Sequence, residues 1–131
     1  MSKFVTKDSG KRQDYDSGMR RDLQEGKPRY DLVIPLDCEN PMLKRWAELL
    51  ERGMSKYGYR NWELSNSVEE LIRFQSSAFR HFVQWQMGEK DEDHAAAVFF
   101  NIQAYEYLSE KLDLSEEQRK EIFNKIAKTN V

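Results

Sequence analysis

Residues 95–108 are apolar on nearly every side, and this stretch constrains the fold more than any other part of the chain. A helix that is apolar all round must be covered by other elements, so the stretch predicts the central helix of a bundle. Ala95 and Ala96 near its start are small enough to let a neighbouring helix approach closely. Asn101 lies in its middle, and an amide at that depth needs a partner from the protein or from a ligand.

A first amphipathic helix is predicted over residues 41–57. Asn40 can cap its N-terminus, Pro41 fits the first helical position, and Gly58 can end the helix with a positive φ. The apolar residues share one face and predict a buried stripe, formed by Met42, Leu43, Trp46, Leu49, Leu50, Gly53 and Tyr57.

A second helix is predicted over residues 68–87, because Ser67 and Glu70 form a capping box before an apolar stripe. His81 lies beside this stripe, where a histidine is more often a satisfied core residue than a ligand. Arg80 points away from the centre of the stripe and is a freer candidate for binding. The stripe consists of Leu71, Phe74, Ala78, Phe82 and Trp85, widened by Ile72, Phe79 and Val83.

A last helix is predicted over residues 116–128, where Ser115 and Gln118 form another capping box and the apolar stripe is thin. The predicted fold is therefore all-α, with three long helices and a C-terminal helix in a domain over residues 41–131. Residues 1–40 form an irregular N-terminal arm that we expect to contribute to the site. Since the bundle is thin and has helix faces to spare, we expect a homo-oligomer, as a dimer or tetramer.

The totals exclude several classes of function. A net charge of −2 over 131 residues gives no basic excess of the kind that binds a nucleic-acid polymer. No apolar run has transmembrane length, and the N-terminus lacks the apolar core of a signal peptide, so we expect no membrane partner. The single cysteine predicts a location in the reducing cytoplasm. Cys38 is the single cysteine and lies between Asp37 and Glu39, whose charges predict an inert thiol.

Residues 53–62 combine cations, aromatic rings and an amide, which suits a small anionic ligand that carries a base. Ordinary packing at a helix end, with basic side chains lying along aromatic rings, is the more common origin of such a mixture. The candidate binding residues in this stretch are Lys56, Tyr57, Arg60, Asn61 and Trp62.

An acidic turn comes immediately before the central helix. It contains Glu89, Asp91, Glu92 and Asp93 and is followed by His94. Acids are favoured at a helix N-terminus by the helix dipole and by capping, which would explain them without a ligand. Their density exceeds what capping needs, and clustered oxygen ligands suit Mg²⁺ or Mn²⁺. The residues alone leave the metal site and the simple cap as alternatives, and the resemblance described below favours the metal site.

Glu48 and Glu51 are three residues apart and share the face opposite the apolar stripe of the first predicted helix. Such a pair can hold a divalent cation in a metal enzyme, whereas in an ordinary helix it forms a solvated face. The solvated face is the more common case.

The arm over residues 1–40 is polar, contains several glycines and shows no sustained period, which indicates a flexible segment or loops. Residues 16–22 and 26–32 place glycine beside basic side chains, so that backbone N–H groups and cations could approach a phosphate together. Lys27 and Arg29 are the candidates there, and a solvated tail is the alternative.

Five strings, taken in order, resemble a family of phage and prophage proteins, the dATP/dGTP diphosphohydrolase N-terminal domain family. They are DSGMRRD, EGKPRYDL, RGMSKYGYRNWE, SAFRHFVQW and GEKDEDHAAAVFFN, and the resemblance covers residues 16–108, most of the chain. The family is grouped with the MazG-like all-α nucleoside triphosphate pyrophosphohydrolases. The resemblance implies phage nucleotide metabolism in the cytoplasm of the host bacterium.

The resemblance also implies cleavage of dATP or dGTP to the monophosphate and pyrophosphate, with Mg²⁺ or Mn²⁺ as cofactor. The expected catalytic residues are Asp93, His94 and Glu51. The expected metal ligands are Glu48, Glu51, Glu89, Asp91 and Asp93. The expected phosphate-binding residues are Lys27, Arg29, Lys56, Arg60 and Arg80. The side chains expected to hold the base, the sugar or another substrate group are Tyr57, Asn61, Trp62 and Asn101.

The sequence departs from the wider MazG pattern, in which an EExxE helix and an ExxD helix hold the metal. The first helix here offers only Glu48 and Glu51, and Ala97 and Asn101 stand where further ligands are expected. Either the metal lies at the acidic cluster of residues 89–94, or the protein binds nucleotides without cleaving them, as a sponge or sensor. A helical module that binds a partner protein is the third alternative.

Overall fold

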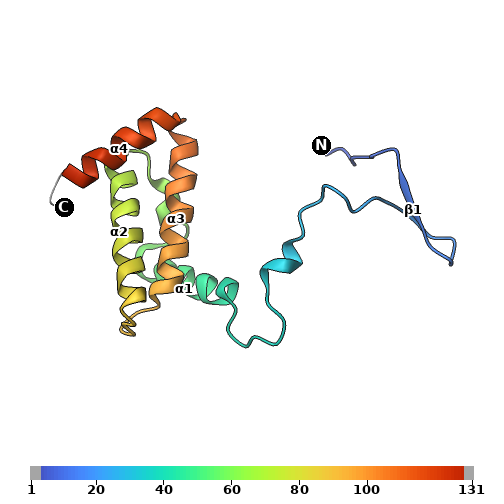
Figure 1. Cartoon of the computed structure of the whole chain (residues 1–131), viewed down its shortest axis with the longest axis horizontal. Helices are drawn as coiled ribbons and strands as arrows, with labels where there is room; N and C mark the ends of the chain where they lie inside the picture. Colours follow the sequence, from blue (N-terminus) through green and yellow to red (C-terminus); the bar gives the residue numbers. More distant parts are fainter. Residues whose placement is uncertain (1–3, 129–131) are drawn as a thin grey trace. The chain divides into compact units, whose positions relative to one another are not determined.

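The computed structural model describes residues 4–128, and the chain divides into two compact units, Met1–Val33 and Ile34–Val131. All the α-helices of the described residues belong to the second unit (Figure 1). They are α1 (Met42–Tyr57), α2 (Val68–Gln86), α3 (His94–Lys111) and α4 (Glu116–Lys128). The predicted all-α fold with three long helices and a C-terminal helix is confirmed.

The N-terminal unit contains a hairpin that the sequence pattern did not predict. Its strands β1 (Arg12–Asp14) and β2 (Arg20–Asp22) pair antiparallel. Gly18 closes the turn with a φ of 94°, a conformation that glycine adopts at little cost. A 3-10 helix, η1, follows over Tyr30–Val33. Strands of three residues are too short to show a period of two, and for this reason the sequence predicted an irregular arm.

The start of α1 differs from the prediction that Asn40 caps it. Pro41 occupies the capping position with an extended backbone, and no side chain caps the helix there. Asn40 instead accepts a hydrogen bond from Lys44 Nζ at 3.1 Å. Proline offers no side-chain acceptor, so the first N–H groups of α1 depend on solvent. The predicted end is confirmed, because Gly58 follows the last turn with a φ of 105°.

The apolar stripe of α1 is not buried as predicted. None of its residues is fully buried, and Leu43 and Tyr57 keep 43% and 62% of their surface exposed. Trp46 packs edge-on against Phe99 of α3, with ring centroids 5.9 Å apart. Because α1 packs mainly against α3, one neighbour cannot cover the whole stripe.

Helices α2 and α3 pack side by side and form the main pair of the bundle (Figure 1). The predicted capping box of α2 is confirmed, since Ser67 Oγ accepts from the Glu70 N–H at 3.3 Å. Ala96 and Ala104 of α3 are fully buried, as expected for small residues under a closely packed helix.

The prediction that the outer part of the α2 stripe is buried is wrong. Phe79 is 70% exposed and Trp85 51%, and Phe82 and Val83 are also exposed. The apolar residues cover a wider arc of α2 than α3 can bury, so part of the arc faces solvent within this chain. Ile102 of α3 is likewise 51% exposed, so the central helix is not covered on every side.

Helix α4 closes the far end of the bundle. Its predicted capping box is confirmed, since the Gln118 N–H donates to Ser115 Oγ at 3.2 Å. Ile122 joins Leu71 and Leu108 in the buried core cluster, whereas the adjacent Phe123 is 57% exposed.

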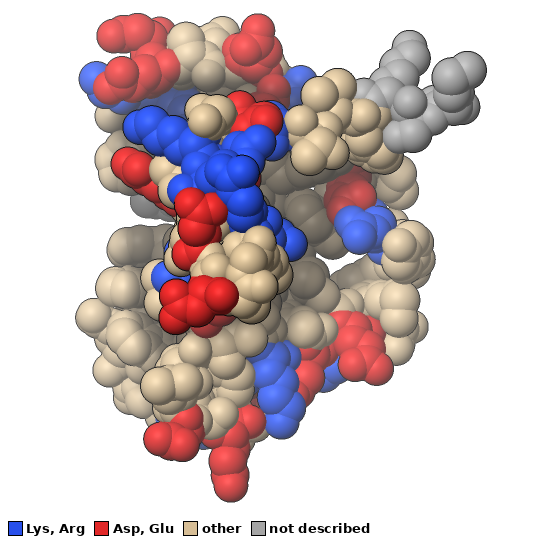
Figure 2. All heavy atoms as spheres, turned by 90° about the vertical axis from the view of Figure 1, so that its right-hand side faces the viewer, with Lys and Arg blue, Asp and Glu red and all other residues tan. Residues whose placement is uncertain are grey.

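None of the described helices is both long and apolar enough to cross a membrane. On the face drawn in Figure 2, acidic and basic side chains lie among one another, in keeping with the near-balanced charge of the sequence.

Candidate functional site

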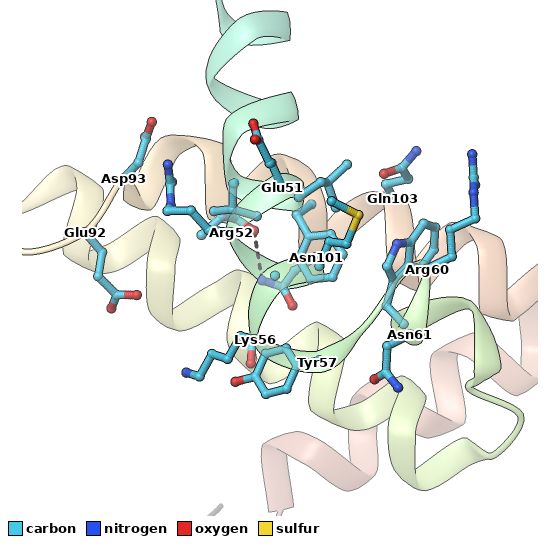
Figure 3. A pocket seen from close by; sticks show the side chains of 18 of the residues that line it. Glu51, Arg52, Lys56, Tyr57, Arg60, Asn61, Glu92, Asp93, Asn101 and Gln103 are labelled. Carbon is cyan, nitrogen blue, oxygen red and sulfur yellow. Dashed lines mark hydrogen bonds between the residues drawn. The ribbon is translucent and has the colours of Figure 1, made fainter.

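A groove of about 1230 Å³ lies within the helical unit. Its walls come from the second half of α1, the loop carrying the 3-10 helix η2 (Asn61–Leu64), the acidic turn before α3, and the facing sides of α2 and α3 (Figure 3). Pockets that bury a nucleotide-sized ligand commonly measure several hundred to about 1,000 Å³. The groove is therefore large enough for a nucleotide.

Four basic side chains line the groove. They are Arg52, Lys56, Arg60 and Lys90. The Lys56 ammonium lies 5.0 Å from the centre of the Tyr57 ring. The hydrogen bond and the electrostatic interaction with Tyr57, and to a smaller extent the charge of Glu92, raise the pKa of Lys56.

Arg60 is more restricted than the other cations of the groove. It has a left-handed backbone, with a φ of 52°, at the residue that precedes η2. Its guanidinium pairs with Glu63 and lies 5.4 Å from the centre of the Tyr59 ring. Binding a phosphate would therefore require Arg60 to leave or share its contact with Glu63.

Trp62 forms a fixed aromatic wall of the groove. Its ring meets the rings of Phe100 and Tyr107 edge-on, with centroids 5.8 Å and 5.1 Å away. Asn61 precedes it at the start of η2, so the amide and the indole enter the groove from the same turn. Tyr57, on the last turn of α1, is 62% exposed, and its ring lies in the groove beside the Lys56 ammonium.

Asn101 presents a fixed hydrogen-bond acceptor. The residue is 6% exposed, and its Nδ2 donates to the Ala97 carbonyl at 2.8 Å. That bond fixes which way the amide points, and it leaves the side-chain oxygen turned toward the interior of the groove (Figure 3). A buried acceptor in this position suits a donor on a ligand.

The Asp93 carboxylate is engaged by two other parts of the protein. Arg45 Nε and Nη2 donate to its two oxygens at 2.9 Å and 2.7 Å, and the Ala96 N–H donates to Oδ1 at 3.1 Å. The Arg45 contact, more than the helix cap, lowers the pKa of Asp93. The carboxylates of Glu51 and Glu92 also face the groove, and among the described residues neither carboxylate accepts a hydrogen bond or forms an ion pair.

Two histidines form a hydrogen-bonded chain behind the groove wall. The Nδ1 atoms of His81 and His94 lie 2.8 Å apart, and His94 Nε2 lies 2.8 Å from Asp91 Oδ1. On the other side, Arg80 Nη2 lies 3.3 Å from His81 Nε2. Burial, and then the charge of Arg80, lower the pKa of His81. The expectation that His81 is a satisfied core residue is thus met, yet the same histidine also lines the groove.

One assignment of protons satisfies this chain with both rings neutral. Arginine only donates and an ionised carboxylate only accepts. His94 Nε2–H therefore donates to Asp91, which leaves His94 Nδ1 bare to accept from His81 Nδ1–H. His81 Nε2 is then bare and accepts from Arg80.

The groove collects most of the predicted substrate-binding residues and some of the predicted ligands. The predicted residues that line it are Glu51, Lys56, Tyr57, Arg60, Asn61, Trp62, Asp91, Asp93 and Asn101. Glu48, Arg80, Glu89 and His94 do not line it. Arg80 Nη1 donates to Gln84 at 2.9 Å, and Glu48 lies 3.9 Å from Lys44.

Lys27 and Arg29 belong to the N-terminal unit and have partners there. Arg29 donates to both oxygens of Asp31, at 2.8 Å and 2.6 Å, and Lys27 lies 3.8 Å from Asp22. Their role in phosphate binding stays a prediction.

Sequence reasoning missed several groove residues. Arg52 and Lys90 are the cations among them, and Ser77 and Gln103 add polar groups from α2 and α3. Arg52 is one helical turn before Lys56, so the spacing of four could have indicated a shared face. The sequence carries no comparable signal for Ser77 or Gln103.

The fold is an all-α bundle, and its groove brings cations, aromatic rings and carboxylates together. The chain belongs to the family described as dATP/dGTP diphosphohydrolase, N-terminal, which residues 8–117 match. The resemblance noted from the five strings is thereby confirmed, and the match extends beyond them at both ends. Searches of curated proteins and of solved structures find no match.

Proposed function

We propose that the groove binds a purine deoxynucleoside triphosphate, dATP or dGTP, and hydrolyses it to the monophosphate and pyrophosphate. The observation that carries the proposal is the convergence of cations, aromatic rings and a buried amide acceptor on one groove, in a member of this family. The family supports the substrate class, and the groove supports the way in which it is held.

The groove has two chemically different ends. Figure 3 shows Arg52, Lys56 and Glu92 toward one side, and Arg60 and Asn61 toward the other. Arg52 and Lys56 would hold the triphosphate, because neither is paired with a carboxylate oxygen of a described residue. The base would then lie near Asn61 and Trp62, where an aromatic face and an amide are available.

Hydrolysis at the α-phosphorus requires a water oxygen to form a bond to that phosphorus. The bond between the α-phosphorus and the oxygen that bridges to the β-phosphate breaks at the same time. Pyrophosphate then leaves, and the water proton passes to a base. Of the three expected catalytic residues, Glu51 is the one that lines the groove with a carboxylate not used by another described residue. Asp93 is held by Arg45, and His94 lies behind the wall, so we assign them to positioning.

Divalent metal use is implied by the family, and the acidic turn offers groups that fit a cation. Asp91 and Glu92 line the groove, whereas both carboxylate oxygens of Asp93 already accept from Arg45. A bound cation would neutralise the phosphate charge and polarise its oxygens. The protein's own part is to place that charge at the phosphate end of the groove.

Turnover and binding should be measured on the same preparation. The intact chain is incubated with each dNTP and Mn²⁺ or Mg²⁺, and pyrophosphate release is followed. Affinity is measured in parallel by calorimetry with a non-hydrolysable α,β-imido analogue. Selective release of pyrophosphate from dATP or dGTP is the expected result. Release of inorganic phosphate as the direct product, or a lack of nucleotide binding, would contradict the proposal.

A binding protein without turnover is the second candidate, and the Arg45–Asp93 pair favours it. That pair removes one carboxylate from an already small set of acidic groups in the groove. Tight binding of the purine nucleotides, with no product over many hours, would establish a sponge or sensor instead of a hydrolase.

A further inference from the structure

We infer that His81, Glu92 and His94 bind a first-row transition-metal ion, such as Mn²⁺, Co²⁺ or Zn²⁺, in the wall of the groove. One ligand atom from each of these residues lies within 4.8 Å of the other two, and the described residues contain no second group of this kind. The claim that this ion serves hydrolysis rests on the proposed function. The metal site itself can be tested without any nucleotide.

His94 is already oriented as a metal ligand. It is 2% exposed, and its Nε2–H donates to Asp91 at 2.8 Å. Histidines that ligate metals generally donate their other ring N–H to a carboxylate or carbonyl, which fixes the ring and the tautomer. Here that contact leaves the Nδ1 lone pair of His94 directed at the space it shares with His81.

His81 needs one rearrangement to become the second ligand. Its Nδ1 carries the proton that lies between the two rings, 2.8 Å from His94 Nδ1. If this proton moves to His81 Nε2 through solvent, both Nδ1 atoms carry a free lone pair. The two lone pairs can then bind the same ion. Arg80 must then turn from Nε2, and it keeps its contact with Gln84. The ion thus takes the place of a proton, with no net change in protonation.

Glu92 supplies the third ligand and faces the groove. Its side chain is exposed and makes no hydrogen bond within the described part of the chain, so it is free to turn toward the two imidazoles. Three protein ligands leave further positions of the ion open, as in metal sites that also take water or a substrate oxygen. His81 and Glu92 both line the groove, so those positions face the phosphate end.

The donor atoms select the class of ion. Two imidazole nitrogens and one carboxylate suit Mn²⁺, Co²⁺ or Zn²⁺, whereas Mg²⁺ favours oxygen ligands and retains its waters. The chain of hydrogen bonds from Arg80 to Asp91 is also complete without an ion. A purely structural histidine pair is therefore the rival account, and it predicts no binding of any of these ions at the rings.

The test titrates Co²⁺ into the tag-free, intact chain and follows its visible absorption together with calorimetry. Nitrogen ligation shifts and strengthens the d–d bands of Co²⁺, so the spectrum reports the imidazoles directly. Glu92→Gln is compared with Glu89→Gln, which removes the same charge from the same turn but lies outside the groove and the cluster. His81→Gln is the third variant, and its fold is checked by circular dichroism.

We expect one Co²⁺ per chain with a nitrogen-ligated spectrum, and much weaker binding of Mg²⁺. Glu92→Gln should weaken Co²⁺ binding by about tenfold or more, comparable with losses seen when metal sites lose a supporting group, while Glu89→Gln changes it less than about twofold. Equal losses in the two glutamate variants, or a spectrum of hydrated Co²⁺ in the wild type, would overturn the site. A bound Co²⁺ without nucleotide turnover would leave the site standing and count against the hydrolase alone.

Discussion

Arg45 and Asp93 form a two-point ion pair that ties the first turn of α1 to the start of α3. The two N···O distances are 2.9 Å and 2.7 Å, and 22% of the Asp93 side chain is exposed. Asp93 caps α3 at the same time, so one carboxylate fixes the position of the acidic turn relative to α1. The pair therefore positions the acidic turn, with Glu92, in the groove wall.

The first prediction concerns this pair. Asp93→Asn retains a good cap but loses the ion pair, so we expect a loss of about 1–2 kcal/mol in the free energy of unfolding. Arg45→Met should cost a similar amount, and the double variant little more, as urea unfolding of all three would show. Arg119→Met breaks the more exposed pair with Glu106 and should cost less than about 1 kcal/mol. If Asp93 is a metal ligand instead, Asp93→Asn alone abolishes the metal-induced rise in melting temperature.

The second prediction concerns phosphate binding. Lys56→Ala should weaken triphosphate binding by about 1–3 kcal/mol, roughly tenfold to a hundredfold, because a charge-assisted contact is lost. Binding of the unphosphorylated nucleoside should barely change. Lys44→Ala is the matched control, since Lys44 is an α1 lysine outside the groove. Calorimetry with the α,β-imido analogue and with the nucleoside measures both effects, and equal losses for the two ligands would show that Lys56 shapes the fold.

Helix positions and most of the groove loop could be predicted from the sequence because their signals are local. The capping boxes at Ser67 and Ser115 and the glycine at position 58 each act over a single turn. The stretch of residues 53–62 combines chemical groups that are close in the chain, so their meeting in one groove needs no knowledge of packing.

The contacts between distant residues could not be predicted in this way. Arg45 and Asp93 are 48 residues apart, and His81 and His94 lie on two helices whose relative rotation the sequence does not state. A histidine beside an apolar stripe is predicted to be a core residue as long as its partner on another helix is unknown. The exposure of Phe79 was missed for a related reason, since periodicity shows that a residue is apolar and does not show how much surface a neighbour can cover.

The third prediction concerns pH. Hydrogen bonds from the Asn66 N–H and from Ser67 lower the pKa of Glu70 below its ordinary value of 4.5. The ionised carboxylate therefore stabilises the folded state. This contribution is fully present above pH 4.5 and is lost as the pH falls through the lowered pKa. The difference in melting temperature between wild type and Glu70→Gln should be clear at pH 6 and shrink at pH 3, and a constant difference would contradict it.

The fourth prediction concerns self-association, which the exposed apolar side chains of α2 favour. Phe79 and Trp85 leave 70% and 51% of their surface exposed in the single chain. We expect light scattering to give the mass of a dimer or tetramer at micromolar concentration. Phe79→Ser should shift the distribution toward the monomer without loss of helical content. A wild type that is monomeric at all concentrations would contradict the expected homo-oligomer.

The last prediction concerns Asn101, whose amide oxygen faces the groove while Nδ2 is bonded to the Ala97 carbonyl. That carbonyl is also a normal acceptor for the helix N–H four residues later, so losing Nδ2 does not leave it without a partner. Asn101→Leu has a similar volume and should change the melting temperature little.

If the oxygen accepts a hydrogen bond from the nucleotide, Asn101→Leu should weaken nucleotide binding by about tenfold, since the ligand donor loses its partner. Ser109→Ala is the control, because Ser109 is equally buried on α3 but lies outside the groove. Calorimetry with the α,β-imido analogues of dATP and dGTP measures both variants. Unchanged affinity in a folded Asn101→Leu protein would assign Asn101 to the packing of α3, because its only partner would then be its own helix.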